Sequence, residues 1–420
     1  MKLKKVTSIL LAAVILVTTS AFSANALAEP EAESEPLGTS TACAGNILGE
    51  FSGVPACVNE NGELHICENN FPDSAFRNYL RDAFGFTENS YITENKADTV
   101  TNIYCQTFEY DNDSSIVISF KGIEFFKFLA TFECNGFIYE NFRSGGKVKE
   151  LNLDNNKMLT ELNCRGNQIQ TLSLKNCTNL LTLYCQNNQL SSLDLSNNKN
   201  LTKIECSNNN LVSIDLSNQT DLTYFICNYN NLTELDLSNN TKLLSLGCSN
   251  NKLKELDVSN NVELLNLSFT FNEIYNLDLS KNRKIVDTGW FGNHLAQLDL
   301  AGLEQMSFEY LGESQDQTID LKAYPDGNGN WKINLSERIT KDGLKNVTVT
   351  TDGAEYDSNT GIITVNHFPN EISYSYYNGL VGDFDNFNTM DPKNPLTHLF
   401  VKINVTKGEE PSSDPEEPTT

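Results

Sequence analysis

The sequence predicts a mainly β protein whose centre is a right-handed solenoid, with a small helical cap before it and a β-sandwich after it. The main observation is a repeat. Asparagine recurs every 21 residues from Asn167 to Asn293, and an apolar side chain does so from Leu172 to Leu298. A fixed period between about 20 and 50 residues is typical of stacked repeats that share one core. The second observation is that this rhythm stops after Met306, where β-prone runs and turn signals begin.

The first 28 residues have the three-part pattern of a secretory signal. Lys2, Lys4 and Lys5 precede an apolar run at 9–17, and Ala26–Ala28 provides small residues for cleavage. The run is too short to span a bilayer, and no later stretch reaches the roughly 20 apolar residues that a spanning helix needs. We therefore expect a signal peptide at 1–28, export from the cell, and no membrane insertion.

The composition limits the classes of partner. The chain has 420 residues, of which 39% are hydrophobic, and this is enough for two or three folded domains. Its formal net charge of -25 repels phosphate backbones and anionic lipids. We therefore expect no nucleic-acid partner and no binding to membrane surfaces.

Residues 29–97 are expected to form a linker and a helical cap. From Phe71 to Phe84 the apolar residues have helical spacing, and Pro72 and Asp73 suit the first turn. A short amphipathic helix at this place would cover the N-terminal end of the solenoid core.

The solenoid is expected over residues 98–305. Seven regular coils run from Leu159 to Gln305 with the pattern L-x-x-L-x-C-x-x-N-x-L-x-x-L-D-L-S-x-N-x-x. Each coil contains two alternating segments, such as Ile204–Cys206 and Ile214–Leu216, which we expect to be two short parallel strands. Two irregular coils precede the regular ones, with strands expected at 100–105 and 132–134 and an insertion at 141–147.

Two columns of asparagine are expected to hold the coils together. A side-chain amide at a buried turn can satisfy backbone groups of the neighbouring coil, and buried amides must be paired. Cys177 and Gln219 interrupt the second column, which would weaken it. The first column contains Asn167, Asn188, Asn209, Asn230, Asn251, Asn272 and Asn293, and the second contains Asn156, Asn198, Asn240, Asn261 and Asn282.

Residues 306–407 are expected to form an immunoglobulin-like β-sandwich. Short β-prone runs occur there, and turn signals at 326–329 and 359–361 separate some of them. A cover of this kind would keep the apolar edge of the last coil out of water. The tail at 408–420 is rich in Glu, Pro and Ser and has the composition of a linker.

The repeat pattern resembles a known family. With its column of cysteines, it is similar to the 21-residue leucine-rich repeats of internalin J-like bacterial proteins. The stretch Asn70–Leu80 also resembles the cap of many secreted leucine-rich-repeat proteins. The resemblance implies a surface or secreted protein that binds other molecules, and it indicates the fold more specifically than the ligand. Related caps often continue into an acidic loop with glycine. This chain has Phe86–Glu94 there, so we expect no calcium loop.

The cysteine column is predicted to be a stack of buried thiols. Neighbouring β-carbons in parallel strands lie near the rung spacing of about 4.8 Å, whereas a disulfide prefers roughly 3.8 Å. Phe269 and Trp290 continue the column, which a metal or redox site would not tolerate. Three further cysteines lie in the cap, where a bridge is plausible but its pairing is open. The column contains Cys164, Cys185, Cys206, Cys227 and Cys248, and the cap contains Cys43, Cys57 and Cys67.

An aspartate column is expected to form a solvated acidic face on the second segments. Like charges repeated at about 5 Å repel one another. Bound cations or partial protonation could relieve this repulsion, so a calcium role is the alternative to a plain solvated face. The column contains Asp194, Asp215, Asp236, Asp257, Asp278 and Asp299.

A ligand site is predicted on the first-strand face, at outward positions where the repeat varies. Consensus positions build the scaffold and variable positions are free to differ. Exposed aromatic side chains on a rigid face are typical of binding hot spots. The alternative is that these are scattered surface aromatics, or that they contact the insertion. The candidate partner-binding residues are Tyr184, Tyr224, Ile226, Tyr229 and Phe271.

The sequence therefore predicts a monomeric, non-catalytic binding module for an extracellular protein or glycan. Its four histidines are isolated from one another, and the motifs of zinc peptidases, serine hydrolases and phosphate-binding loops are missing from the sequence. We expect no catalytic residues, no metal ligands and no cofactor. Two alternatives remain open: a spacer module of a larger surface protein, and a hydrolase that uses a hidden pair of carboxylates.

Overall fold

The structure is a computed structural model. It describes residues 47–105, 107, 116–138, 143–300, 303, 317–369, 371–377 and 398–408, and all of them belong to one compact unit, Ala42–Thr420. The expected signal peptide, Cys43 and residues 409–420 of the expected tail lie outside the described residues. In the described part of the chain, the helices are all too short or too polar to cross a membrane.

The N-terminal part combines a small antiparallel sheet with two helices. The predicted helix is present as α1, Ser74–Phe84, and Asp73 is its N-cap residue rather than a member of its first turn. Ala75, Phe76 and Leu80 are the buried residues of this helix. The sheet before it was not predicted. Its strands are β1 (Ile47–Phe51), β2 (Val54–Val58), β3 (Leu64–His65) and β4 (Tyr91–Ile92), and the second helix is α2 (Glu94–Ala97).

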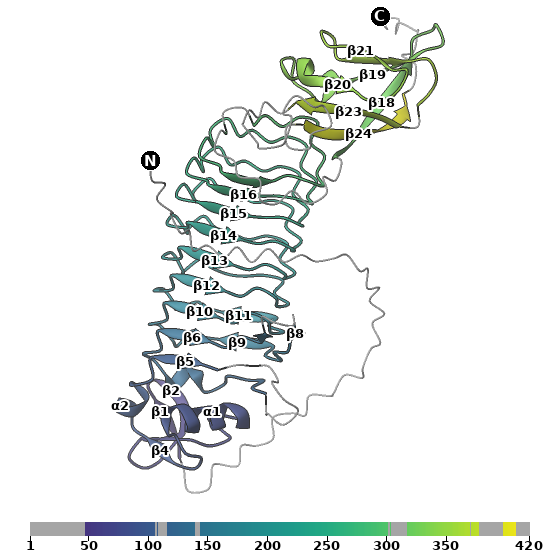
Figure 1. The fold of residues 1–420 in the computed structure, drawn as a ribbon. Coiled ribbons are helices and arrows are strands. Elements are labelled where there is room, and N and C mark those ends of the chain that lie inside the picture. Colours follow the sequence, from purple (N-terminus) through teal and green to yellow (C-terminus); the bar gives the residue numbers. More distant parts are fainter. Residues whose placement is uncertain are drawn as a thin grey trace, which may run out of the picture. The chain divides into compact units, whose positions relative to one another are not determined.

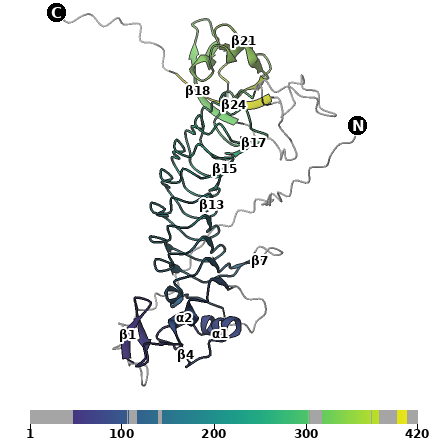
Figure 2. The same cartoon turned by 90° about the vertical axis from the view of Figure 1, so that its left-hand side faces the viewer.

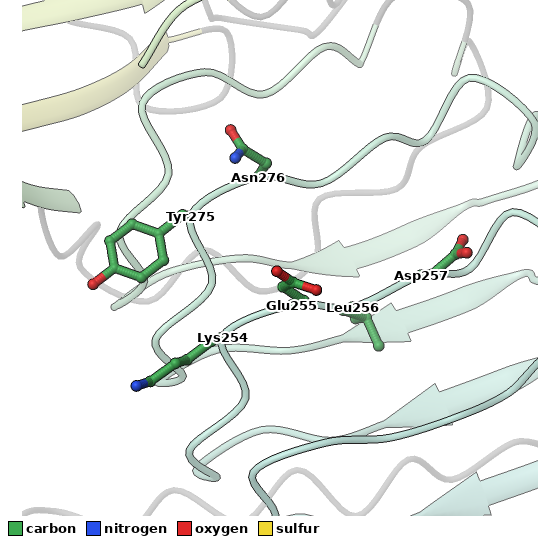
Figure 3. A pocket seen from close by; sticks show the side chains of 6 residues that line it. All are labelled: Lys254, Glu255, Leu256, Asp257, Tyr275 and Asn276. Atoms are coloured by element: carbon green, nitrogen blue, oxygen red, sulfur yellow. The ribbon is translucent and has the colours of Figure 1, made fainter. Parts of the chain in front are cut away.

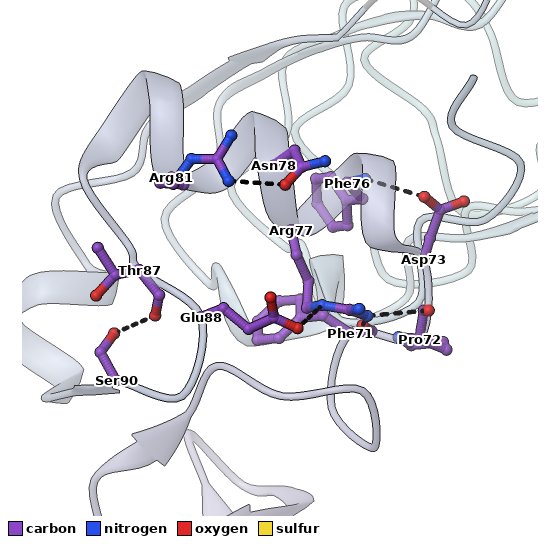
Figure 4. Close-up of polar contacts among 10 residues, drawn as sticks. All are labelled: Phe71, Pro72, Asp73, Phe76, Arg77, Asn78, Arg81, Thr87, Glu88 and Ser90. Carbon is purple, nitrogen blue, oxygen red and sulfur yellow. Dashed lines mark hydrogen bonds and ion pairs between the residues drawn. The ribbon is translucent and has the colours of Figure 1, made fainter. Parts of the chain in front are cut away.

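Ring packing and the hydrogen bonds of Asp73 hold α1 in place. Aromatic rings connect it to the first coils, because the Phe76 ring lies 5.1 Å from that of Phe120, and Phe120 lies 5.0 Å from Phe132. Asp73 accepts a hydrogen bond from the Phe76 amide with one carboxylate oxygen (Figure 4). Its other oxygen accepts from the amides of Ile118 and Ser119, which lie in the loop at 116–122.

The first segments of the coils form one parallel sheet, as predicted. Within the described residues it has nine strands, paired in register with their neighbours along the stack (Figures 1 and 2). The two irregular coils belong to this sheet. The strands are β5 (Asn102–Tyr104), β6 (Thr131–Glu133), β10 (Glu161–Asn163), β12 (Thr182–Tyr184), β13 (Lys203–Glu205), β14 (Tyr224–Ile226), β15 (Ser245–Gly247), β16 (Asn266–Ser268) and β17 (Asp287–Gly289). The 3-10 helix η1 (Ile123–Phe125) precedes β6, and the hairpin β7 (Phe137–Ile138) and β8 (Arg143–Ser144) begins the insertion.

The second segments mostly do not form the strands that we predicted. Only β9 (Glu150–Asn152) and β11 (Thr171–Ser173) pair as a parallel ladder among the described coils. From Leu193 onward the segment is extended without strand pairing, so the prediction of two strands per coil is wrong there. In the segments from Asp194 to Asp278, the aspartate accepts the amide two residues ahead, as Asp215 does from Ser217 at 2.9 Å. Asn152 of the paired strand β9 accepts the Asp154 amide in the same way at 3.0 Å, so this local bond does not by itself prevent pairing.

The first asparagine column connects each coil to the coils on both sides. Asn209 donates through Nδ2 to the carbonyls of Cys185 and Cys206 at 3.0 Å each, and its Oδ1 accepts from the Leu190 amide at 3.0 Å. The other members repeat these bonds at the same spacing. The buried amide ladder that the sequence predicted is therefore confirmed.

Residues outside the repeat complete this ladder at both ends. At the N-terminal end, Thr107 Oγ1 donates to Asn167 Oδ1 at 2.8 Å. At the C-terminal end, Gln317 Oε1 accepts from the amides of Asn293 and Leu295, at 3.2 and 3.3 Å. Inside the repeat a neighbouring coil pairs with these polar groups, and at the two ends Thr107 and Gln317 pair with them instead.

The second column keeps bonds to the preceding coil even at the two positions that we expected to weaken it. Asn198 donates to the carbonyls of Leu174 and Cys177 in the preceding coil. Gln219, which we expected to weaken the column, keeps the equivalent bonds to Leu195 and Asn198 because its longer side chain reaches both carbonyls. Cys177 contributes its thiol, 3.2 Å from the Leu153 carbonyl.

The cysteine column is a stack of free, buried thiols, as predicted. Cys105 and Cys134 of the irregular coils extend it, and Cys57 and Cys67 of the cap are also buried and are not joined in a disulfide. Burial raises the pKa of Cys206 and Cys248 to about 12, since the thiolate would lose its solvation.

We expect the thiols of this column to resist alkylation by iodoacetamide at pH 8.5 until the solenoid unfolds. The folded thiol stays protonated while an unfolded thiol, with a pKa of 9.0, ionises. The unfolded state therefore releases protons first, and the column's contribution to stability is lost as the pH rises above about 9. Peptide mass spectrometry after timed labelling measures this, with urea-unfolded protein as the control. Labelling of Cys206 at equal rates in both states would contradict the prediction.

The C-terminal part is a seven-stranded mixed sheet within the described residues. Its strand order is β20-β23-β24-β18-β19-β22-β21, in which β18 and β24 pair in parallel. Tyr374 donates its hydroxyl to the Ala296 carbonyl of the last coil at 2.8 Å. The elements are β18 (Gln317–Pro325), β19 (Trp331–Asn334), η2 (Leu335–Glu337), η3 (Gly343–Asn346), β20 (Val347–Val349), β21 (Glu355–Asp357), β22 (Ile362–Val365), β23 (Glu371–Tyr377) and β24 (His398–Lys407).

Candidate ligand-binding face

The predicted site residues all lie on the outer side of the nine-stranded sheet, but they do not form one cluster. Tyr184, Tyr224 and Ile226 are half-buried on β12 and β14. Tyr229 and Phe271 are more accessible, with 46% and 44% of their surface exposed. Tyr184 and Tyr224 lie together, whereas Phe271 is two coils beyond Tyr229.

Lys203 joins the two half-buried tyrosines, and sequence reasoning did not single it out. Its Nζ lies 4.9 Å from the centre of the Tyr184 ring and 4.4 Å from that of Tyr224. A cation held between two rings stabilises both, by roughly 0.5 to 1 kcal/mol for each contact near the surface. The signal that could have found it is the position of Lys203 on β13, between the strands that carry the two tyrosines.

Burial changes the pKa values of two ionisable side chains at these tyrosines. Burial raises the pKa of Glu205, while Lys203 and Arg165 oppose that shift. Burial, followed by the nearby Glu205 and Tyr184, raises the pKa of Tyr224 to about 12. Tyr224 is therefore a neutral hydroxyl at physiological pH, and it contacts Lys203 in a cluster that also contains Tyr184 and Glu205.

Tyr229 and Phe271 occupy an unusual backbone conformation. They belong to a column of turn residues that follows the sheet, and every member has a positive φ. Glycine and asparagine adopt this left-handed region at low cost, whereas other L-residues lose roughly 1–2 kcal/mol there. The column contains Gly166, Asn187, Asn208, Tyr229, Asn250, Phe271 and Gly292, with φ between 53° and 73°. The two aromatic residues are thus placed where the backbone favours Asn or Gly.

A low, polar surface lies between these two aromatic side chains, and we call it the shelf. It consists of the outward residues of the coils that carry β15 and β16. Ser249 and Ser268 share a hydrogen bond between their hydroxyls at 2.8 Å, and the Thr270 amide donates to Ser249 Oγ at 3.1 Å. The shelf residues are Ser245, Gly247, Ser249, Asn250, Asn266, Ser268 and Thr270, all of them uncharged.

Two glycines leave room for the large side chains at the edges of the shelf. A β-carbon on Gly247 would lie 2.8 Å from Ile226 Cδ1, so the Ile226 side chain extends over this glycine. A β-carbon on Gly292 would lie 2.5 Å from Phe271 Cδ1, so an edge of the Phe271 ring lies against the backbone of the next coil. Larger residues at either position would displace these side chains.

The aspartate column is a set of turn residues on the exposed second segments. Asp194, Asp236 and Asp278 each accept the amide of the serine two residues ahead, at 2.8 to 3.0 Å. These backbone hydrogen bonds hold the pKa values of the carboxyl groups below their usual range. Partial protonation, one of the two ways we considered for relieving their repulsion, is therefore wrong. In the described ranges, groups of three side chains suited to hold a metal ion are not found.

An open depression next to this column brings two carboxylates near each other. Lys254, Glu255, Leu256, Asp257, Tyr275 and Asn276 line it (Figure 3). Glu255 and Asp257 are both exposed, and Asp257 is engaged by the Ser259 amide at 2.8 Å. A carboxylate pair needs shielding from water to differ in protonation, and this arrangement does not provide it.

The three histidines whose side chains are described take part in structural contacts. The His65 ring stacks on Tyr91 with a centroid distance of 4.7 Å. His294 stacks on Tyr275 at 5.0 Å, and its Nδ1 lies 2.6 Å from the Thr318 carbonyl. His367 Nδ1 lies 2.7 Å from Asn366 Oδ1.

The chain is similar to several solved protein structures. No protein-family model matches the chain, and no curated protein matches it either. Internalin C2 from Listeria monocytogenes is 20% identical and has a TM-score of 0.45, with 53% of this chain and 95% of that chain covered. InlP from Listeria monocytogenes is 17% identical with a TM-score of 0.47, and the coverage is 82% and 98%.

A third similar structure has a related feature in its description. The functional domain of InlJ from Listeria monocytogenes "includes a cysteine ladder"; it is 20% identical, with a TM-score of 0.28, and 81% of this chain and 98% of that chain are covered. These three similar structures are internalins of one bacterium, Listeria monocytogenes.

Proposed function

We propose that this protein is an exported, non-catalytic binding module whose outer sheet face recognises a protein or glycan outside the cell. The observation that carries the proposal is the pair Tyr229 and Phe271. Both rings are exposed at turn positions whose backbone favours Asn or Gly. Rigid stacking of the coils holds these rings in place, and preorganised aromatic side chains are typical of binding hot spots.

The proposed site comprises Tyr184, Tyr224, Ile226, Tyr229 and Phe271, with Lys203 added. The Tyr184–Lys203–Tyr224 contacts support the idea of an ordered surface, since they fix three long side chains before a ligand arrives. A binding role is favoured over hydrolysis because the carboxylates that lie close together are open to water.

The proposal includes an immunoglobulin-like domain after the solenoid. The strand order supports it. If the sheet is divided where β18 meets β24, one side has the order β21-β22-β19-β18 and the other has β24-β23-β20. This division matches, strand for strand along the chain, the four-stranded and three-stranded sheets of a constant-type immunoglobulin domain, which supports the proposal. Export is supported by the signal pattern of residues 1–28.

The expected result of replacing Tyr184, Tyr224 and Tyr229 together by alanine is loss of ligand capture from extracts of host or microbial cell surfaces. The three changes remove the proposed hot spot while the buried core stays intact. Immobilised wild-type and variant proteins are compared by mass spectrometry and glycan analysis of what they retain. The matched control is Tyr104→Ala, because Tyr104 is 58% exposed on β5 of the same sheet but outside the site. Capture that is equal for all three proteins would refute the site.

A further inference from the structure

We infer that the shelf between Tyr229 and Phe271 binds a neutral oligosaccharide, an inference that rests on the proposed recognition role of the outer sheet face. It names the class of ligand and confines the contact to three neighbouring coils. Four features of the shelf carry it: the two rings, their spacing, the polar groups between them and the lack of charge.

The two rings occupy a position where the other members of the column are Asn or Gly. Asn is found at positions 187, 208 and 250. About half of each aromatic residue is buried, which offsets the cost of the left-handed backbone, while 46% of Tyr229 and 44% of Phe271 remain exposed. The stacked coils thus hold two partly exposed rings that a ligand can reach.

The spacing of the rings suits a chain of sugars. Tyr229 and Phe271 are two coils apart, which at about 4.8 Å for each rung places them about 10 Å apart along the stack. The C–H face of a pyranose ring is apolar and packs on an aromatic ring. Two such platforms at this distance can hold alternate units of a linear oligosaccharide.

The groups between the rings match sugar hydroxyls. Ser245, Ser268 and Thr270 supply partly exposed hydroxyls, and each hydroxyl has one donor and two acceptor sites. Ser249 is buried, and its Oγ contacts Ser268 Oγ and the Thr270 amide, so it supports these residues and does not face a ligand. Asn250 and Asn266 add amides that donate and accept. Such neutral groups pair with ligand hydroxyls that also donate and accept.

The charge of the protein excludes the acidic sugars. The chain carries a net charge of -25, which repels uronates and sulfated glycans. The shelf itself has no ionisable residue at its outward positions on β15 and β16. An acidic ligand would thus find no cation to compensate for that repulsion, whereas a neutral ligand is unaffected by it.

The size of the shelf favours a sugar over a protein. From β14 to β16 there are two rungs, about 10 Å, and the outward positions extend about 16 Å along the strand, so the shelf covers roughly 160 Å². Each partner in a standard protein–protein interface buries about 800 Å². A protein ligand would need most of its contacts elsewhere, but an oligosaccharide of a few units is the right size.

The test is titration calorimetry of the whole chain with cellohexaose, xylohexaose, mannohexaose and chitohexaose, and with hexagalacturonate as the acidic probe. We expect at least one neutral hexasaccharide to bind and hexagalacturonate not to bind. Tyr229→Asn and Phe271→Asn should each weaken binding about tenfold, which is the loss of one aromatic contact. Both variants should melt within about 2 °C of the wild type, because relief of the backbone strain and loss of ring burial offset each other. Tyr104→Asn is the control and should bind as the wild type does.

Three outcomes would overturn the inference: no binding of any neutral probe, stronger binding of hexagalacturonate, or unchanged affinity in both shelf variants. Surface extracts separate this failure from failure of the proposed function. Capture that survives periodate oxidation of the extract but not protease digestion, and that is lost in Tyr229→Asn, would keep the recognition face and assign it to a protein. Capture that survives protease and is lost after periodate would support the sugar.

Discussion

Replacement of Asn209 by alanine is expected to lower the free energy of unfolding by about 4 kcal/mol, the sum of several buried groups left without partners. The Asn209 side chain satisfies the carbonyls of Cys185 and Cys206 and the amide of Leu190, so one change affects two successive coils. Alanine fills none of these roles, and water cannot reach the groups because the side chain is buried. Urea unfolding followed by far-ultraviolet circular dichroism measures the loss.

The neighbouring Asn208 is the matched control. It lies at the exposed turn position with φ 53°, where Gly is found in other coils, so Asn208→Gly should change stability by less than about 0.5 kcal/mol. Asn209→Asp should be as damaging as Asn209→Ala, since it places an acceptor against two carbonyls. A loss below about 1 kcal/mol for Asn209→Ala would mean that the ladder does not hold the coils together.

The centre of the fold was predictable because its information repeats. Seven coils place Leu and Asn at the same offsets, and five of them also place Cys at one offset, so the stacking of Leu183, Ile204 and Phe225 in register follows from the period alone. The ends of the solenoid were not predictable in this way. Thr107 and Gln317 complete the asparagine ladder, but each occurs once and outside the repeat, so no pattern marks it.

The candidate site was predictable in position but not in organisation. Variable outward positions indicated the correct face, and Tyr184 and Tyr224 do lie together there. The sequence did not reveal that Lys203 lies between them, because a contact across three strands depends on side-chain direction. Nor did it separate Tyr229 and Phe271 from the others. Their column looked like a variable strand position, and only the backbone angles show that it is a left-handed turn.

Replacement of Asp73 by alanine is expected to lower the free energy of unfolding of the N-terminal part by about 4 kcal/mol, because hydrogen bonds to a buried charged group contribute about 1.5–3 kcal/mol each. One carboxylate oxygen caps α1 at the Phe76 amide at 2.9 Å, and the other accepts from Ile118 at 2.7 Å and Ser119 at 2.9 Å (Figure 4 shows the first of these bonds). Asp73 thus connects the helix to the chain that leads into the irregular coils. Amide hydrogen exchange, read at Phe76, Ile118 and Ser119, measures the loss together with thermal unfolding.

Two variants separate the roles of the Asp73 carboxylate. Asp73→Asn keeps one acceptor oxygen, which can still cap α1, but it turns an amide group toward Ile118 and Ser119; exchange should therefore accelerate at those two residues more than at Phe76. Asp82→Asn changes an exposed carboxylate at the other end of the same helix and should leave all three amides protected. If the Ile118 amide stays protected in Asp73→Ala, the loop is held by the packing of Phe120 against Phe76 and Phe132 instead, and the carboxylate only caps the helix.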